Sequence, residues 1–361
     1  MGERGPTPGG SRGGAIDRPR QRARLSDVAA AAGVSKSIAS RILNDRPDLT
    51  VQPDTRQRVL DAASRLDYSP HAGALTVAGS QTGAVAFLVP PLSNPVYVRI
   101  LRGAFAEALR HDLVVLLVED LEPRQATTTL LRLVRSGRID GLIMASATPR
   151  HPLVGELRDS YIPHVFVNRA VPGSHRNVVM DDAKSSEAAW RHLFELGHRS
   201  IGLVGGPTQI EPTRRRERAF LAAASRDGFE VPVEHAPFTE DGGAQATRAL
   251  LSRHPELTAL HTSSLNQAVG TLGAAAAAGV SVPEQLSVIA YDDMPLADHL
   301  NPPLTTIRMP LAELGAAAVA ALVAQLGGDE FGDQVVETRP EVIVRHSTAP
   351  PPRSKRRPRS G

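Results

Sequence analysis

From Gly83 onward, apolar runs of strand length alternate with helical patterns, and this alternation limits the possible folds more than any other feature of the chain. The expected strands, all of them buried, are AVAFLV (84–89), LVVLLV (113–118), GLIM (141–144), HVFV (164–167), VVM (178–180), SIGLV (200–204), LTAL (257–260) and LSVIAY (286–291). The helical patterns cover 95–110, 124–136, 183–196, 213–227, 243–253, 266–279 and 310–327. Such alternation predicts an α/β core of parallel sheets covered on both faces, here two doubly wound subdomains within 83–348.

The length and composition exclude several classes of protein. The 361 residues are too many for one simple core, so two or three domains are expected. The chain has no cysteine, which excludes disulfides and thiolate metal sites, and its histidines show no metal-ligand spacing such as H-E-x-x-H, so no cofactor is expected. The first ten residues, MGERGPTPGG, lack the apolar segment of a secretory signal, and no apolar run is long enough to span a membrane. These features predict a cytoplasmic protein without a membrane partner.

Basic charge is concentrated at the two ends of the chain. Residues 1–80 carry 12 basic and 8 acidic side chains (net +4), residues 345–361 carry 6 basic and no acidic ones (net +6), and residues 81–344 carry 23 basic and 30 acidic ones (net −7). The Gly-, Pro- and Arg-rich arm 1–24 and the basic tail 349–361 are expected to be disordered. A basic end on an acidic body suits a protein that meets phosphate groups.

The stretch LSDVAAAAGVSKSIASRILN (25–44) predicts two short helices joined by a tight turn. Gly33 suits the turn, and Ser35 can cap the second helix with its hydroxyl. The outer face of the second helix would carry Lys36, Ser37, Ser40 and Arg41. Such a face fits the major groove of DNA, where Lys and Arg can donate to guanine. The plainer alternative is an ordinary helical hairpin with a polar outside.

A third helix is expected from Pro53 to Asp67, with an apolar stripe of Val59, Leu60, Ala63 and Leu66. It would complete a small headpiece over 25–69. Residues 70–82 follow as a linker that could form two turns of helix, which is too short to be helical alone in water. We therefore expect a hinge segment that a partner could order.

In open parallel sheets, ligands bind at the carboxyl ends of the strands. That rule directs attention to the loops that follow the expected strands: PPLSNPVY, ASATPR, NRAVPG, GGPTQIEPTRRR, HTSSLN and YDDMP. These loops are rich in hydroxyl, amide, carboxylate and guanidinium groups, which are suited to a small polar ligand.

Eight motifs in a fixed order give the chain a family resemblance: LSDVAAAAGVSKSIASRILN, DTRQRVLDAASRLDYSP, LSNPVY, RIDGLIM, VNRAVPG, LFELGHRSIGLVGGP, VPEQLSVIAYDD and PPLTTIRMPLAELG. On these motifs, residues 24–348 resemble the lactose-repressor-like (LacI/GalR) transcriptional regulators. The resemblance implies a helix-turn-helix headpiece, a hinge helix and a periplasmic-binding-protein-like core. It also implies a homodimer or a dimer of dimers on a palindromic operator. It divides the core into an N-subdomain, about 83–177 and 308–328, and a C-subdomain, about 178–307 and 329–348, with an effector between them.

The resemblance also implies which residues contact DNA. The recognition positions fall on Lys36, Ser37 and Arg41, with Ser35, Ser40 and Asn44 nearby for phosphate. In the hinge they fall on Ala74 and Val77. Val77 stands where the family usually has a leucine that wedges into the minor groove, and Gly73 stands where it has a larger helix former.

The effector positions implied by the resemblance are Tyr97, Asn168, Arg216, Ser264 and Asp292. The resemblance implies a sugar or sugar derivative as the effector, with a nucleobase as the alternative, and the chemistry of these residues suits a polyol. Tyr97 could instead be core packing, Asp292 a turn or helix cap, and the arginine run around Arg216 a solvated face. Ser264 stands where the family has an asparagine, so its shorter side chain would reach less far.

Two other functional classes are open at this point. The first is an enzyme. GGP at 205–207 follows a strand, but neither of the phosphate-binding motifs G-x-G-x-x-G and GxxxxGK[ST] is present. His198 is expected to be a capping or packing residue rather than a catalytic base. A sugar-binding transport receptor would share the core but not the headpiece. We therefore predict a DNA-binding, ligand-responsive regulator that acts as a repressor, and a dimer rather than a tetramer, because no heptad repeat follows the core.

Overall fold

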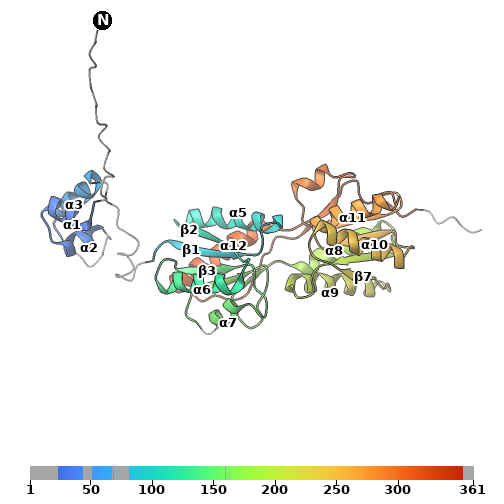
Figure 1. The fold of residues 1–361 in the computed structure, drawn as a ribbon, viewed down its shortest axis with the longest axis horizontal. Helices are drawn as coiled ribbons and strands as arrows, with labels where there is room; N and C mark the ends of the chain where they lie inside the picture. Colours follow the sequence, from blue (N-terminus) through green and yellow to red (C-terminus); the bar gives the residue numbers. More distant parts are fainter. Residues whose placement is uncertain (1–22, 44–50, 67, 69–80, 159, 353–361) are drawn as a thin grey trace, which may run out of the picture. The chain divides into compact units, whose positions relative to one another are not determined.

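The computed structural model describes residues 23–43, 51–66, 68, 81–158 and 160–352. The chain divides into two compact units, Met1–Ser80 and Gln81–Gly361. Each unit is described by itself (Figure 1). The predicted contact residues Asn44, Ala74 and Val77, the position Gly73 and most of the two basic ends lie outside the described residues.

The first unit contains the helices α1 (Leu25–Ala32), α2 (Lys36–Leu43) and α3 (Pro53–Arg65). Gly33 takes the left-handed conformation at φ +66° between α1 and α2, which few other residues adopt without strain. The Ser35 hydroxyl accepts the Ile38 N–H at 3.2 Å, so the predicted cap of α2 is confirmed. Buried small and branched residues share one core: Val28, Ala29, Ala32, Ala39, Ile42, Val59, Ala62 and Ala63.

The predicted stripe on α3 is wrong in part. The helix ends at Arg65 rather than Asp67, and Leu60 and Leu66 are 41% and 37% exposed. The buried face instead consists of Val59, Ala62 and Ala63. Small alanines fill it because α1 and α2 approach closely.

The second unit contains two six-stranded sheets. The strand order of the first is β11-β5-β4-β3-β1-β2, and all its neighbours are parallel. Its strands are β1 (Ala84–Val89), β2 (Val114–Glu119), β3 (Gly141–Met144), β4 (His164–Val167), β5 (Asn177–Val179) and β11 (Gln334–Val335). Its helices are α5 (Pro95–Arg110), α6 (Pro123–Arg135), α7 (Pro152–Arg158) and α12 (Leu311–Gly327).

The second sheet has the order β12-β10-β9-β8-β6-β7, with β12 antiparallel to β10 and the other pairs parallel. Its strands are β6 (Ile201–Gly205), β7 (Val233–His235), β8 (Ala259–Thr262), β9 (Ser287–Tyr291), β10 (Thr305–Arg308) and β12 (Glu341–Ile343). The helices α8 (Asp182–Glu195), α9 (Glu211–Arg226), α10 (Glu240–Arg253) and α11 (Leu265–Ala277) accompany it, together with the 3-10 helix η1 (Pro295–His299). Figure 1 shows these helices beside their sheet.

Burial on both faces explains why the central strands are continuous apolar runs. In β1, Val85 and Phe87 face the core shared with α5 and α12, while Ala86 and Leu88 face the core shared with α6 and α7. A side chain at Gly103 would overlap the backbone of Ala312, so the glycine permits the close approach of α5 and α12.

The prediction that every strand is buried is wrong for β2. Val114, Leu116 and Leu117 are 68%, 42% and 38% exposed, because β2 is the edge strand of the first sheet. The strands β7, β10, β11 and β12 and the helix α7 were not predicted from the sequence.

The predicted subdomain boundaries also need correction at two crossings. Residues 178–179 belong to β5 and residues 334–335 to β11, and both strands pair within the first sheet rather than the second. Each of these two segments therefore belongs to the N-subdomain, and the chain crosses to the C-subdomain only after β5 and again after β11. No helix in the described part of the chain is long and apolar enough to cross a bilayer.

Candidate functional site

In each sheet, the two strands that come next along the chain lie on opposite sides of the first strand. β1 is followed by β2 on one side and β3 on the other, and β6 is followed in the same way by β7 and β8. Such switch points are where open α/β sheets bind ligands, just beyond the carboxyl ends of the strands. The five predicted effector residues follow β1, β4, β6, β8 and β9, at this end of the two sheets.

Arg216 lies on α9 and is held by a buried carboxylate. Its Nε donates to Asp182 Oδ1 at 2.7 Å, and its guanidinium carbon lies 4.2 Å from the centre of the Tyr291 ring. Burial would lower the pKa of Arg216, but the charge of Asp182 raises it above the ordinary value. Arg216 is therefore a charged, buried donor, and it uses only Nε for hydrogen bonds among the described residues.

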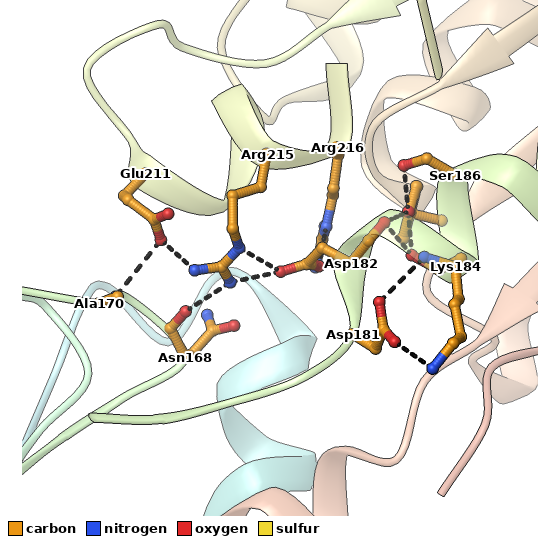
Figure 2. A network of polar contacts seen from close by, with 11 residues as sticks. Asn168, Ala170, Asp181, Asp182, Lys184, Ser186, Glu211, Arg215 and Arg216 are labelled. Atoms are coloured by element: carbon orange, nitrogen blue, oxygen red, sulfur yellow. Dashed lines mark hydrogen bonds and ion pairs between the residues drawn. The ribbon is translucent and has the colours of Figure 1, made fainter. Parts of the chain in front are cut away.

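Asp182 pairs with two arginines at once. Arg215 also donates to Asp182 Oδ2, through Nε at 3.1 Å and through Nη2 (Figure 2). The Asp182 side chain is fully buried. A buried charge is stable only when it is paired, so this carboxylate and the two guanidinium groups depend on each other.

The same network joins the two sheets. Arg215 Nη2 donates to the backbone oxygen of Asn168 at 3.4 Å, and the Ala170 N–H donates to Glu211 Oε2 at 3.3 Å (Figure 2). Glu211 and Arg215 belong to α9 beside the second sheet, whereas Asn168 and Ala170 follow β4 of the first. Arg215 Nη1 and Glu211 Oε2 are themselves bonded at 2.5 Å.

Asn168 and Asp292 occupy equivalent places in the two sheets. Each follows a central strand directly, each has a positive φ (+67° and +74°), and each is buried. Asn and Asp tolerate this conformation better than most residues, but it still costs free energy of order 1–3 kcal/mol. Burial raises the pKa of Asp292 to about 6, against the opposing charge of Arg216.

Tyr97 lies in the first turn of α5, which begins at Pro95 after Asn94 caps it by accepting the Val96 N–H. Its ring belongs to the core, and its hydroxyl accepts from Arg169 Nη2 at 3.1 Å. The Tyr97 ring therefore packs in the core, while its hydroxyl lies at the polar end of the first sheet.

Ser264 has a local structural role. Its hydroxyl caps α11 by accepting the Gln267 N–H at 3.2 Å. His198, predicted to be a capping or packing residue rather than a base, is buried and bonded to Thr258, Ser287 and the backbone of Ala349. Within the described ranges, no group of His, Asp or Glu side chains is arranged to hold a metal ion.

Buried polar atoms without a hydrogen-bond partner mark the same end of both sheets. Among the described residues these atoms are Asp120 Oδ1, Ser146 Oγ, Asn168 Oδ1 and Arg169 Nε in the loops of the first sheet, and Thr213 Oγ1, Gln267 Oε1 and Asp292 Oδ1 beside the second. Most buried polar atoms in folded proteins are paired, so unpaired ones need an explanation. Asn168 and Asp292 were predicted; the other five were not, although Ser146, Arg169 and Thr213 lie in the loops that the strand-end rule selected.

The predicted DNA-contacting residues of α2 and its cap lie mostly on the exposed side of the helix. Ser35, Lys36, Ser37 and Arg41 are exposed and Ser40 is half-buried, while Ala39 and Ile42 face the headpiece core. The helix thus presents polar and basic side chains on one side and packs with the other.

Residues 24–71 match bacterial regulatory proteins of the lacI family, and residues 190–348 match a periplasmic binding protein-like domain. The HTH-type transcriptional regulator MalR of Streptomyces coelicolor is 31% identical over 348 residues, which cover 93% of this chain and 99% of MalR. The HTH-type transcriptional repressor CytR of Escherichia coli is 31% identical over 331 residues, which cover 90% and 96%. The solved structure of the transcriptional regulator CelR in complex with cellobiose superposes with a TM-score of 0.69 at 27% identity, over 90% of this chain and all of CelR.

A helix-turn-helix headpiece joined to a two-subdomain, periplasmic-binding-protein-like core defines a DNA-binding transcriptional regulator. The chain belongs to the lacI family of these regulators. The predicted family and fold class are therefore confirmed. The relatives are transcriptional regulators rather than enzymes.

Proposed function

We propose that the protein is a repressor whose affinity for its operator is controlled by a small polar effector bound at the carboxyl ends of the two sheets. The observation that carries this proposal is the set of buried, unpartnered polar atoms, which all lie at that end among the described residues. The relative CytR, a repressor by name, supports the sign of the regulation.

The effector class we propose is a sugar or sugar derivative. The unpartnered atoms of Asn168 and Asp292 are acceptors, and Arg216 offers unused guanidinium donors, so together they suit hydroxyl groups that both donate and accept. The complex of the related CelR with cellobiose supports this class. A nucleobase effector is the alternative.

The proposed mechanism is linkage between effector and DNA. Arg215 and Glu211, beside the second sheet, bond to the backbone of Asn168 and Ala170 after a strand of the first sheet. A ligand bound at the same place would contact both sheets and could favour one angle between them. An effector shifts the operator equilibrium only by its difference in affinity for the two arrangements. The DNA side of this linkage would be the α2 face carrying Lys36, Ser37 and Arg41.

We also propose a homodimer in the cytoplasm, bound to a palindromic operator. Exposed apolar side chains on α5 and on the edge strand β2 support the dimer. The exposed apolar side chains there are Val98, Phe105, Leu109, Val114, Leu116 and Leu117. An isologous contact between two copies would cover this surface.

A gel-shift assay with the DNA upstream of the protein's own gene tests the proposal. Maltose, cellobiose, glucose and cytidine are added in turn, with a random duplex as the control. We expect specific retardation and its release by a sugar. Release by cytidine alone would favour the nucleobase alternative, and retardation that no compound changes would contradict effector control by either class.

A further inference from the structure

A polar group lies at the carboxyl ends of three strands of the first sheet. Asp120 directly follows β2, Ser146 comes two residues after β3, and Arg169 comes two residues after β4. All three side chains are at least nine-tenths buried, and Asp120 Oδ1, Ser146 Oγ and Arg169 Nε have no hydrogen-bond partner. None of the three was among the predicted effector residues.

His151 fixes the orientation of the Asp120 carboxylate. His151 Nδ1 accepts the Leu153 N–H at 3.1 Å, so the ring proton is on Nε2, which donates to Asp120 Oδ2 at 2.9 Å. The two side chains are only 3% and 4% exposed. Asp120 Oδ2 is thus held in place, and Asp120 Oδ1 is a buried acceptor without a partner.

Arg169 is fixed on the opposite side of the group. Its Nη2 donates to the Tyr97 hydroxyl at 3.1 Å and its Nη1 to the Ser146 backbone oxygen at 3.4 Å. Its Nε has no hydrogen-bond partner. Burial opposes ionisation of Asp120, but His151, the nearby Ser146 hydroxyl and the charge of Arg169 hold its pKa below the ordinary value. The group therefore offers a charged acceptor, a hydroxyl and a charged donor side by side.

We propose that Asp120, Ser146 and Arg169 form a subsite that binds a neutral hydroxylated part of the effector. The inference rests on the proposed function and names a part of its ligand. A hydroxyl can donate to Asp120 and accept from Arg169, with Ser146 serving either way. A phosphate or carboxylate would face the ionised Asp120, and an ammonium would face Arg169, so both are disfavoured. His151 and Tyr97 act as positioning residues.

The first test uses stability without ligand, so it does not depend on the identity of the effector. The Ser146 hydroxyl makes no hydrogen bond of ordinary geometry, although it lies near the Asp120 carboxylate. We therefore expect Ser146→Ala to change Tm by less than about 1 °C. Ser347→Ala is the matched control. The Ser347 hydroxyl is equally buried but donates to Val288 and accepts from Thr305, so its loss should lower Tm by more than about 2 °C. A similar fall in Ser146→Ala would show that the hydroxyl is structural and would overturn the subsite.

The second test is calorimetric titration with maltose, cellobiose, glucose, cytidine and glucose 6-phosphate. In Asp120→Asn an amide donor can replace the free acceptor. We expect this variant and Ser146→Ala to bind the wild-type ligand about tenfold more weakly or worse. Wild-type affinity in both variants, or binding of the phosphorylated sugar alone by the wild type, would overturn the subsite. Binding of none of the five compounds would instead count against the proposed function, so the two failures are distinguishable.

Discussion

Asp182 Oδ1 accepts a hydrogen bond of 2.7 Å from Arg216 Nε, and this pair is buried between α8 and α9. Asp182 begins α8 directly after Asp181, which caps the helix by accepting the Lys184 N–H. The ion pair therefore joins the start of one helix to the side of the next. It holds the guanidinium of Arg216 beside Tyr291 with its terminal nitrogens available to a ligand.

We predict that Asp182→Ala destabilises the core by about 3–5 kcal/mol, because it leaves Arg215 and Arg216 without their shared partner. Arg216→Ala should cost less, since Arg215 still pairs with Asp182. Urea unfolding of both variants measures the difference. Equal stability of Asp182→Ala and the wild type would mean that the pair contributes nothing to the fold.

The stability of the protein should depend on the ionisation of Asp292. Its pKa is raised to about 6, whereas an unfolded aspartate titrates near 4, so the folded state holds an extra proton between these values. Stability from this group is full below about pH 4 and is lost as the pH rises through 6, by about 2–3 kcal/mol in all. Asp292→Asn should therefore gain stability over the wild type between pH 4.5 and pH 7 in urea titrations. A constant difference across that range would contradict the shift.

Arg41→Ala should weaken specific operator binding by about 1–3 kcal/mol if Arg41 contacts a base edge. Non-specific binding, which depends on salt, should change little. Fluorescence anisotropy on the operator and on a random duplex separates the two. An equal loss on both duplexes would assign Arg41 to phosphate contacts only.

The exposed apolar residues on α5 and β2 predict that a charge placed among them weakens the dimer. Leu109 and Val114 are 77% and 68% exposed, and a charge at either site would be buried without a partner in a dimer that uses this surface. We expect Leu109→Asp to shift the protein toward the monomer in sedimentation velocity. Leu121→Asp provides a comparison at another exposed leucine, 64% exposed. An unchanged dimer in Leu109→Asp would place the interface elsewhere.

The parts that could be predicted from the sequence were those with local causes. The strands 84–89, 141–144 and 164–167 were predicted to the residue because burial on both faces requires an uninterrupted apolar run. The strand β10, TTIR, gives no such signal, since its buried Thr305 depends on hydrogen bonds to Ser347 and Thr348 from a later part of the chain.

In the candidate site, too, some residues could be predicted from local sequence and others depend on tertiary packing. Asn168 and Asp292 follow apolar strands directly, so the strand-end rule and the family resemblance both select them. Asp182 resembles an ordinary first-turn acidic residue, and its pairing with Arg215 and Arg216 exists only because α8 packs on α9. Ser264 was selected by position, but its hydroxyl caps α11.

The measurement that most directly tests the proposed control by an effector is operator release in an Arg216→Ala variant. Labelled operator is titrated with the compound that releases it from the wild type, and anisotropy reports the bound fraction. We predict that Arg216→Ala binds the operator within a few-fold of the wild type but is not released, because charge-assisted bonds of about 1.5–3 kcal/mol each are lost. Arg226→Ala, at an exposed arginine on the same helix, should be released normally. Normal release of Arg216→Ala would contradict an effector site at the carboxyl ends of the two sheets.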